Sequence, residues 1–184
     1  VGYDQPDQAQ RLVRFLYSRY IEKETDMDIR KIYEYALQRE HEGKKFFEDN
    51  AHRLSHASAV EAFLTLAQEE QKHIEFIETL LKALDEGQPT PASVAEEIQG
   101  SSFFADRALS EKIDQTTLEA MVPDLPVLRM AYLIERDFSE FYENSSASVE
   151  GPAKNILAML AQWERSHERL FKYLHDQAFA EYAQ

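Results

Sequence analysis

The chain has 184 residues, of which 43% are hydrophobic, and this size and composition suit one domain with a sizeable core. Acidic residues outnumber basic ones by 34 to 20, and the formal charge of -14 argues against nucleic-acid and anionic-membrane partners. Cysteine is absent, which excludes disulfides, iron–sulfur clusters and thiolate metal sites and fits a cytoplasmic protein. The longest apolar run, Ile156 to Ala161, is far shorter than the roughly 20 residues that cross a bilayer.

Helices are predicted along most of the chain, because the prolines are few and leave long stretches rich in Glu, Lys, Leu, Ala and Gln. An amphipathic accessory helix is expected at about 9–21, within an N-terminal segment of residues 1–30. Two further helices, at about 28–54 and 57–84, are predicted to pair as an antiparallel hairpin.

A long crossover is predicted at 85–126, where most of the prolines lie, with one or two short helices between 93 and 120. Helix resumes at about 127–147, breaks at Gly151-Pro152 and continues from about 153, which predicts a second hairpin. No segment has the alternating pattern of a strand, so the predicted fold is all-α, with residues 31–184 as one four-helix bundle.

The two predicted hairpins repeat each other. Ala36 to Glu40 is followed by Phe46-Phe47, and Ala131 to Glu135 is followed at the same spacing by Phe141-Tyr142. Further on, Leu66 to His73 matches Leu160 to His167 in the positions of Leu, Ala, Gln, Glu and His. An isolated Glu-x-x-His pair means little in so acidic a chain, but a duplicated one indicates a shared structural role.

The positions of the predicted turns support the interpretation of the two hairpins as a repeat. Residues equally far from the turn of an antiparallel hairpin lie at the same height, because each residue advances about 1.5 Å along either helix. Along the sequence, the midpoint between Glu40 and the pair Glu70/His73 falls near Ser55-His56. The midpoint between Glu135 and the pair Glu164/His167 falls at Glu150-Gly151. Each hairpin therefore places one Glu level with one Glu-x-x-His pair.

Docking the two hairpins would put four carboxylates and two imidazoles into one layer of the core. Burial of so many charges is very costly unless cations neutralise them, and two divalent ions would balance four carboxylates. Mixed oxygen and imidazole donors suit Fe, Mn or Zn. The predicted metal ligands are Glu40, Glu70, His73, Glu135, Glu164 and His167.

On these motifs the chain resembles the rubrerythrin-like branch of the ferritin superfamily, over about residues 32–179. The resemblance implies a ferritin-like four-helix bundle, made of two duplicated hairpins with a long crossover, that binds two iron ions. The implied roles are terminal binding by Glu40 and Glu135, bridging by Glu70 and Glu164, and binding of one metal each by His73 and His167.

Two features depart from rubrerythrins proper. Those proteins carry an extra Glu one turn beyond the third-helix ligand, associated with peroxide reduction, whereas this chain has Phe138 there. They also carry a cysteine-ligated rubredoxin module, so in this chain electrons would come from a separate donor protein. The resemblance is closer to stand-alone members of the branch.

Three classes of function follow from this sequence. The first is a diiron oxidoreductase that reacts with peroxide or dioxygen, by peroxide detoxification or as a ferroxidase. The second is an iron-storage or iron-delivery protein without substrate turnover. The third is a helical interaction module with a structural metal. A homodimer is expected for the redox protein.

Several residues near the predicted ligands have two interpretations. Tyr142, two turns from Glu135, is either a phenol that hydrogen-bonds a ligand or a core aromatic residue, as Phe47 is at the equivalent position. Gly43 either allows close packing or leaves a coordination position open. The remaining interpretations are packing for Trp163, a solvated charge for Glu69, and surface or capping roles for His41, His52, His56 and His175.

Overall fold

The computed structural model describes the backbone of residues 8–88 and 122–183, and the side chains from residue 29 onward within those ranges except Ser58 and Glu181. Every element in this part of the chain is a helix, which confirms the all-α prediction. In chain order the elements are α1 (Gln8–Ala51), α2 (Ala57–Asp85), the 3-10 helix η1 (Val122–Asp124), α6 (Leu125–Ser148) and α7 (Pro152–Tyr182).

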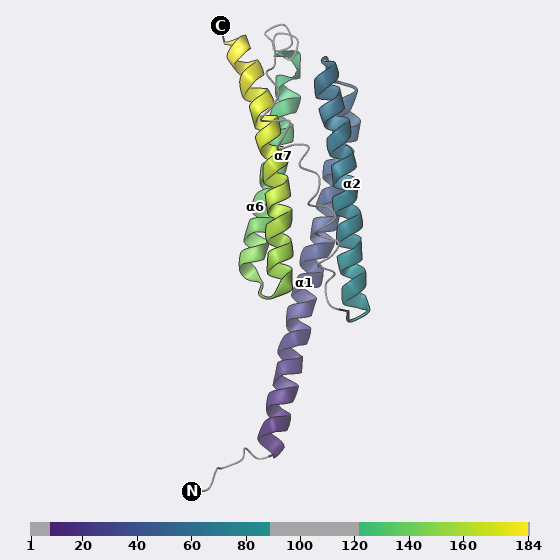
Figure 1. The fold of residues 1–184 in the computed structure, drawn as a ribbon, viewed down its shortest axis with the longest axis vertical. Coiled ribbons are helices and arrows are strands. Elements are labelled where there is room, and N and C mark those ends of the chain that lie inside the picture. Colours follow the sequence, from purple (N-terminus) through teal and green to yellow (C-terminus); the bar gives the residue numbers. More distant parts are fainter. Residues whose placement is uncertain (1–7, 89–121, 184) are drawn as a thin grey trace.

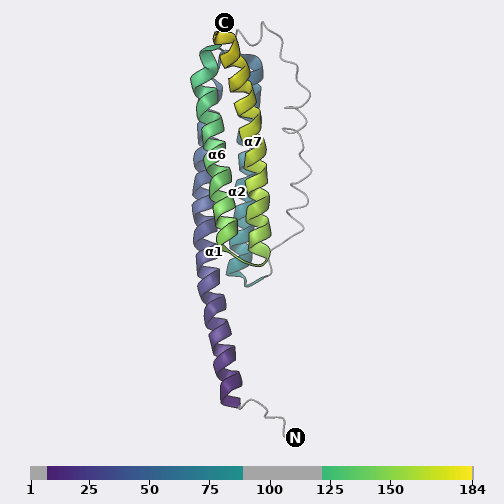
Figure 2. The ribbon, with the colours of Figure 1, turned by 90° about the vertical axis from the view of Figure 1, so that its left-hand side faces the viewer.

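The helices form two antiparallel hairpins, α1 with α2 and α6 with α7, which lie side by side as a bundle (Figure 1). The purple N-terminal part of α1 extends beyond the end of this bundle (Figures 1 and 2). The second hairpin turns at Gly151, whose φ of +70° is a conformation that glycine adopts without strain, and Pro152 then starts α7. This is the break predicted from the sequence.

The predicted division of the N-terminal region into two helices is wrong, because α1 runs without interruption from Gln8 to Ala51. The physical reason is that no proline or glycine occurs between residues 8 and 42, so nothing ends the helix where a break was expected. The apolar face predicted at 9–21 lies outside the described side chains, as do the short helices expected between 93 and 120.

Two apolar clusters fill the bundle, one on each side of a polar layer. The first contains Phe47, Phe63 and Phe171, and the second contains Tyr33, Ile77 and Leu157. On each of the four long helices the predicted metal ligands fall between the two clusters. On α1, for example, Glu40 lies between Ala36 of the second cluster and Phe47 of the first.

One buried carboxylate ties the hairpins together at the end of the bundle. Asp124, at the end of η1, accepts hydrogen bonds from the backbone N–H of Ser55 at 2.8 and 3.1 Å and from that of His56 at 3.3 Å. These two residues lie in the turn between α1 and α2. The start of α6 is therefore fixed to the turn of the first hairpin.

None of the helices in the described parts of the chain has the length and apolar character needed to cross a membrane.

Replacing Asp124 by Ala should lower the free energy of unfolding by about 1–3 kcal/mol, because two N–H groups lose a charged acceptor. Urea unfolding of the metal-free protein measures this loss. Asp124→Asn is the matched control, since it keeps one acceptor oxygen and should lose less. An unchanged unfolding midpoint in Asp124→Ala would show that the bonds to Ser55 and His56 contribute nothing.

Candidate metal centre

The structure brings all six predicted ligands into one buried layer. The four carboxylate residues have no solvent exposure, and the two histidines are 2% and 4% exposed. Two overlapping groups, within each of which the candidate ligand atoms lie within 4.8 Å of one another, make up this layer. They are Glu40, Glu70, His73 and Glu164, and Glu70, Glu135, Glu164 and His167.

Glu70 and Glu164 belong to both groups, so each could contact two ions at once. Glu40 and His73 belong only to the first group, which we call the His73 half. Glu135 and His167 belong only to the second, which we call the His167 half. This division is the one expected for two bridged metal ions, with each half offering one unshared carboxylate and one imidazole.

The His73 half is the more compact. His73 Nδ1 lies 2.9 Å from Glu164, 3.2 Å from Glu70 and 3.3 Å from Glu40. His167 Nδ1 lies 3.3 Å from both Glu135 and Glu164, but 3.8 Å from Glu70.

The donor atoms fit metal ions because many of them have no other partner. Among the described residues, five buried carboxylate oxygens form no hydrogen bond, both of Glu70, both of Glu135 and Oε1 of Glu164. Three of the five, one from each residue, lie 2.9–3.3 Å from an imidazole nitrogen and have no closer cationic neighbour there. Within residues 29–88 and 122–183, every ion pair of the four carboxylates is with His73 or His167 and none is with Lys or Arg. Two imidazoles cannot balance four buried carboxylates, whereas two divalent cations can.

In the metal-free protein, burial and neighbouring charges keep several side chains of this layer protonated. Burial raises the pKa of Glu70 well above its usual range, and the charges of Glu164 and Glu40 add to this. Burial and the charge of Glu164 likewise raise the pKa of Glu135. Burial alone would lower the pKa of His73, but Glu164 and Glu40 outweigh it and raise that pKa well above its usual value.

Glu164 differs from the other two carboxyls. Burial favours a higher pKa for its carboxyl, but the adjacent His73 and His167 outweigh burial and hold the pKa below its usual range. Cation binding at the layer would therefore displace protons chiefly from Glu70, Glu135 and His73.

Tyr142 has the hydrogen bond that one interpretation of the sequence requires. Its buried hydroxyl donates to Oε1 of Glu40, from α6 across to α1. Burial, followed by the charge of Glu40, raises the pKa of Tyr142 well above its usual range, so the phenol keeps its proton and remains a donor. Its counterpart Phe47 has no hydroxyl and packs in the first apolar cluster.

Comparison with known proteins identifies the family. The family model named Rubrerythrin matches residues 31–175, which is most of the chain. The chain belongs to the rubrerythrin family. No curated protein and no solved structure matches the chain. Membership indicates a diiron-type protein, and the buried Glu and His groups are donors of the kind that such a centre uses.

Phe138 lies one turn beyond Glu135 and packs against α1. A Cβ atom added to Gly43 would lie 2.8 Å from Cε2 of Phe138, so the glycine allows the ring to approach α1. The guanidinium of Arg39 lies 4.7 Å from the centre of the same ring. Of the two interpretations of Gly43, close packing is the one that this arrangement matches.

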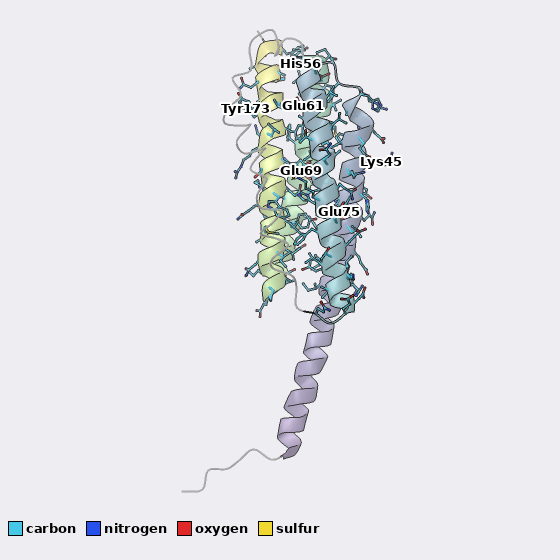
Figure 3. The ribbon with its side chains drawn as sticks, turned by 45° about the vertical axis from the view of Figure 1, so that its right-hand side comes forward. Lys45, His56, Glu61, Glu69, Glu75 and Tyr173 are labelled. Atoms are coloured by element: carbon cyan, nitrogen blue, oxygen red, sulfur yellow. The ribbon has the colours of Figure 1, made fainter. Side chains whose placement is uncertain are left out.

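Two residues beside the ligands differ from what the sequence suggested. The prediction of a solvated Glu69 is wrong, because this residue is 8% exposed and its carboxylate accepts a 2.7 Å hydrogen bond from Lys72. Figure 3 shows Glu69 about halfway along α2. Trp163 packs as predicted, but its partner is His73, on which the indole stacks with ring centres 5.2 Å apart. Because Trp163 precedes Glu164 in the sequence, helical geometry alone would direct its side chain about 100° away from that of Glu164.

The other four histidines lie outside both groups. His41 and His52 are exposed, and the backbone of His56 takes part in the turn that Asp124 holds. His175 is partly buried, with its ring stacked on Phe179.

The metal-free protein should lose stability as the pH rises from about 5.5 to about 7.5. In the unfolded chain Glu70 and Glu135 ionise near their ordinary pKa of 4.5, whereas in the folded state they keep their protons to higher pH. The folded state then holds more protons than the unfolded state, so the free energy of unfolding falls as the pH rises. His73 adds to this fall above its ordinary value of 6.5.

Urea unfolding of chelator-treated protein at these two pH values measures the effect. The lowered pKa of Glu164 matters only near and below its ordinary value of 4.5, outside this window. With metal bound the dependence should reverse, because the ligands must be deprotonated to bind. A metal-free midpoint that rises with pH would contradict the assigned pKa directions.

Proposed function

We propose that this chain is a non-haem diiron oxidoreductase that reacts with peroxide or dioxygen. The observation that carries the proposal is the pair of buried four-residue groups that share Glu70 and Glu164. Family membership favours iron over the other ions that carboxylate and imidazole donors accept. Within residues 29–88 and 122–183, five carboxylate oxygens of the layer form no hydrogen bond, which supports bound cations as the balancing charge.

In this proposal Glu70 and Glu164, which belong to both groups, would hold both ions, Glu40 and His73 would hold one of them, and Glu135 and His167 would hold the other. Bound iron in the reduced state would supply the two electrons needed to break the O–O bond of peroxide.

The protein's own residues would exclude water from the centre and handle protons. Apolar clusters on both sides of the layer exclude bulk water, which strengthens every electrostatic interaction within it. The hydroxyl of Tyr142 fixes one oxygen of Glu40 and holds a proton beside the centre. Phe138 has no proton to give or accept, so we assign proton handling to Tyr142 and the carboxylates.

Restoring the reduced state would require an electron donor outside these 184 residues. The chain has no cysteine with which to bind an iron–sulfur or rubredoxin-type centre of its own. We therefore propose a separate electron-donor protein as a partner.

Anaerobic loading with Fe(II) should give two metals per chain after desalting. Glu70→Ala removes a ligand that both groups share, so it should lower the affinity for both ions by more than about tenfold. Glu78→Ala is the matched control, because Glu78 is exposed on the same helix and belongs to neither group. Fewer than two metals in the unmodified chain, or two retained in Glu70→Ala, would rule out the dinuclear site.

Rapid mixing of the Fe(II)-loaded protein with peroxide and, separately, with dioxygen tests the reaction. We expect peroxide to oxidise the centre faster, because its two-electron reduction matches the two electrons that one centre holds, whereas full reduction of dioxygen needs four. The absorbance of the ligand-to-metal charge-transfer bands measures how fast the bound iron is oxidised. Faster oxidation by dioxygen would indicate a ferroxidase, and inertness to both oxidants would favour iron storage or delivery.

A further inference from the structure

The first half of α1 lies apart from the described helices of its own chain. Residues 8–28, which we call the α1 extension, project beyond the end of the bundle, and in both views no described helix runs beside them (Figures 1 and 2). The extension is roughly 30 Å long at 1.5 Å per residue. Helices in proteins owe most of their stability to the packing of an apolar face, so a surface that covers the extension would stabilise it.

The extension has an apolar side, and this side does not continue the one that packs in the bundle. Residues 18 positions apart are separated by about five complete turns and share one side of a helix. Ser18 and Glu22 lie 18 residues before the buried Ala36 and Glu40, so the bundle-facing side of α1 becomes polar in the extension. The apolar positions fall on another side, at Leu12, Leu16 and Tyr20, with Phe15 beside them.

A groove follows that same side of α1 in the half that belongs to the bundle. The described residues that line it are Glu34, Leu37, Gln38, His41, Glu42 and Lys45. Each of the three apolar positions of the extension lies 25 residues, or about seven complete turns, before a residue of this groove. The pairs are Leu12 with Leu37, Leu16 with His41, and Tyr20 with Lys45. One side of α1 is therefore apolar along its first half and grooved along its second.

An antiparallel pair of α1 helices would bring these two halves together. The middle of α1 lies between residues 29 and 30, and a two-fold axis there places the extension of each copy along the groove of the other. Leu16 of one copy is then within one turn of the height of His41 in the other. Because the contact forms twice and closes on itself, it gives a dimer and not a filament.

Charge favours a second copy as the occupant of the groove. Residues 8–21 contain three arginines and no acidic residue, so they carry +3 in a chain of total charge -14, and the remainder carries -17. The groove itself has Glu34 and Glu42 against Lys45. The basic extension of one copy is therefore attracted to the acidic bundle of the other, which offsets part of the repulsion between two acidic chains.

We propose that two copies of this chain associate through antiparallel α1 helices, with the extension of each copy covering the α1 groove of the other. None of the groove residues belongs to the candidate ligand groups, so the inference does not depend on the proposed function.

Sedimentation equilibrium of the metal-free full chain should give twice the 21.4 kDa mass of one chain. Leu16→Glu should raise the dissociation constant of the dimer at least roughly 100-fold, because each dimer loses two buried leucines and gains two buried charges. Ser18→Glu is the matched control, since it adds the same charge on the polar side of the extension and should leave the dimer intact. Both positions lie outside the bundle, so the bundle should stay folded in both variants.

Introduced cysteines test the orientation, because the chain has none of its own. When Leu16→Cys and His41→Cys are co-expressed and mildly oxidised, a disulfide should join one copy of each variant. Neither variant alone should cross-link, because identical residues at these positions lie more than roughly 30 Å apart in the antiparallel pair and a disulfide needs Cα atoms within about 7 Å.

A monomeric unmodified chain, or a dimer that Leu16→Glu leaves intact, would overturn the inference. Cross-linking of Leu16→Cys to itself would also overturn it, because that result requires parallel helices. A basic amphipathic helix can instead bind a membrane surface, which flotation with phosphatidylglycerol vesicles tests. Monomers that float with the vesicles would overturn the inference, whereas dimers that stay in solution would support it.

Discussion

The bundle is organised around a layer of charge that water cannot reach. Four carboxylates and two imidazoles lie at one height, and apolar clusters cover them on both sides. Lys and Arg are not paired with these carboxylates in the described part of the chain, so protons or cations must supply the missing positive charge. Burial raises the pKa of Glu70 and Glu135 for this reason. Stability, proton content and metal binding are therefore coupled through one set of side chains.

The hairpins depend on each other although each is a complete antiparallel pair. Asp124 of the second hairpin holds the turn of the first, Tyr142 holds Glu40, and the Trp163 indole stacks on the His73 ring. In all three contacts the second hairpin supports the first. The repeat places similar candidate ligands on the two hairpins, whereas the residues beside them differ, as Trp163 and Glu69 do.

An aromatic ring occupies the space beside the layer. Phe138 packs over Gly43, with the guanidinium of Arg39 on its ring. An aromatic ring neither binds a metal ion as a carboxylate does nor transfers a proton. Any proton needed at the centre must then come from groups such as Tyr142 or from the ligands.

The sequence by itself determined the helices, the two hairpins and the common height of the six candidate ligands, because helical rise and turn position follow from local spacing. It did not reveal that α1 is continuous, since a helix without proline or glycine can extend beyond its apolar pattern. The contacts of Trp163, Tyr142 and Phe138 were decided only by the tertiary structure. Their partners lie on other helices, and the rotation of each helix about its axis depends on the packing of the whole bundle rather than on any segment alone. For the same reason Glu69, which was expected to be a solvated charge, is buried.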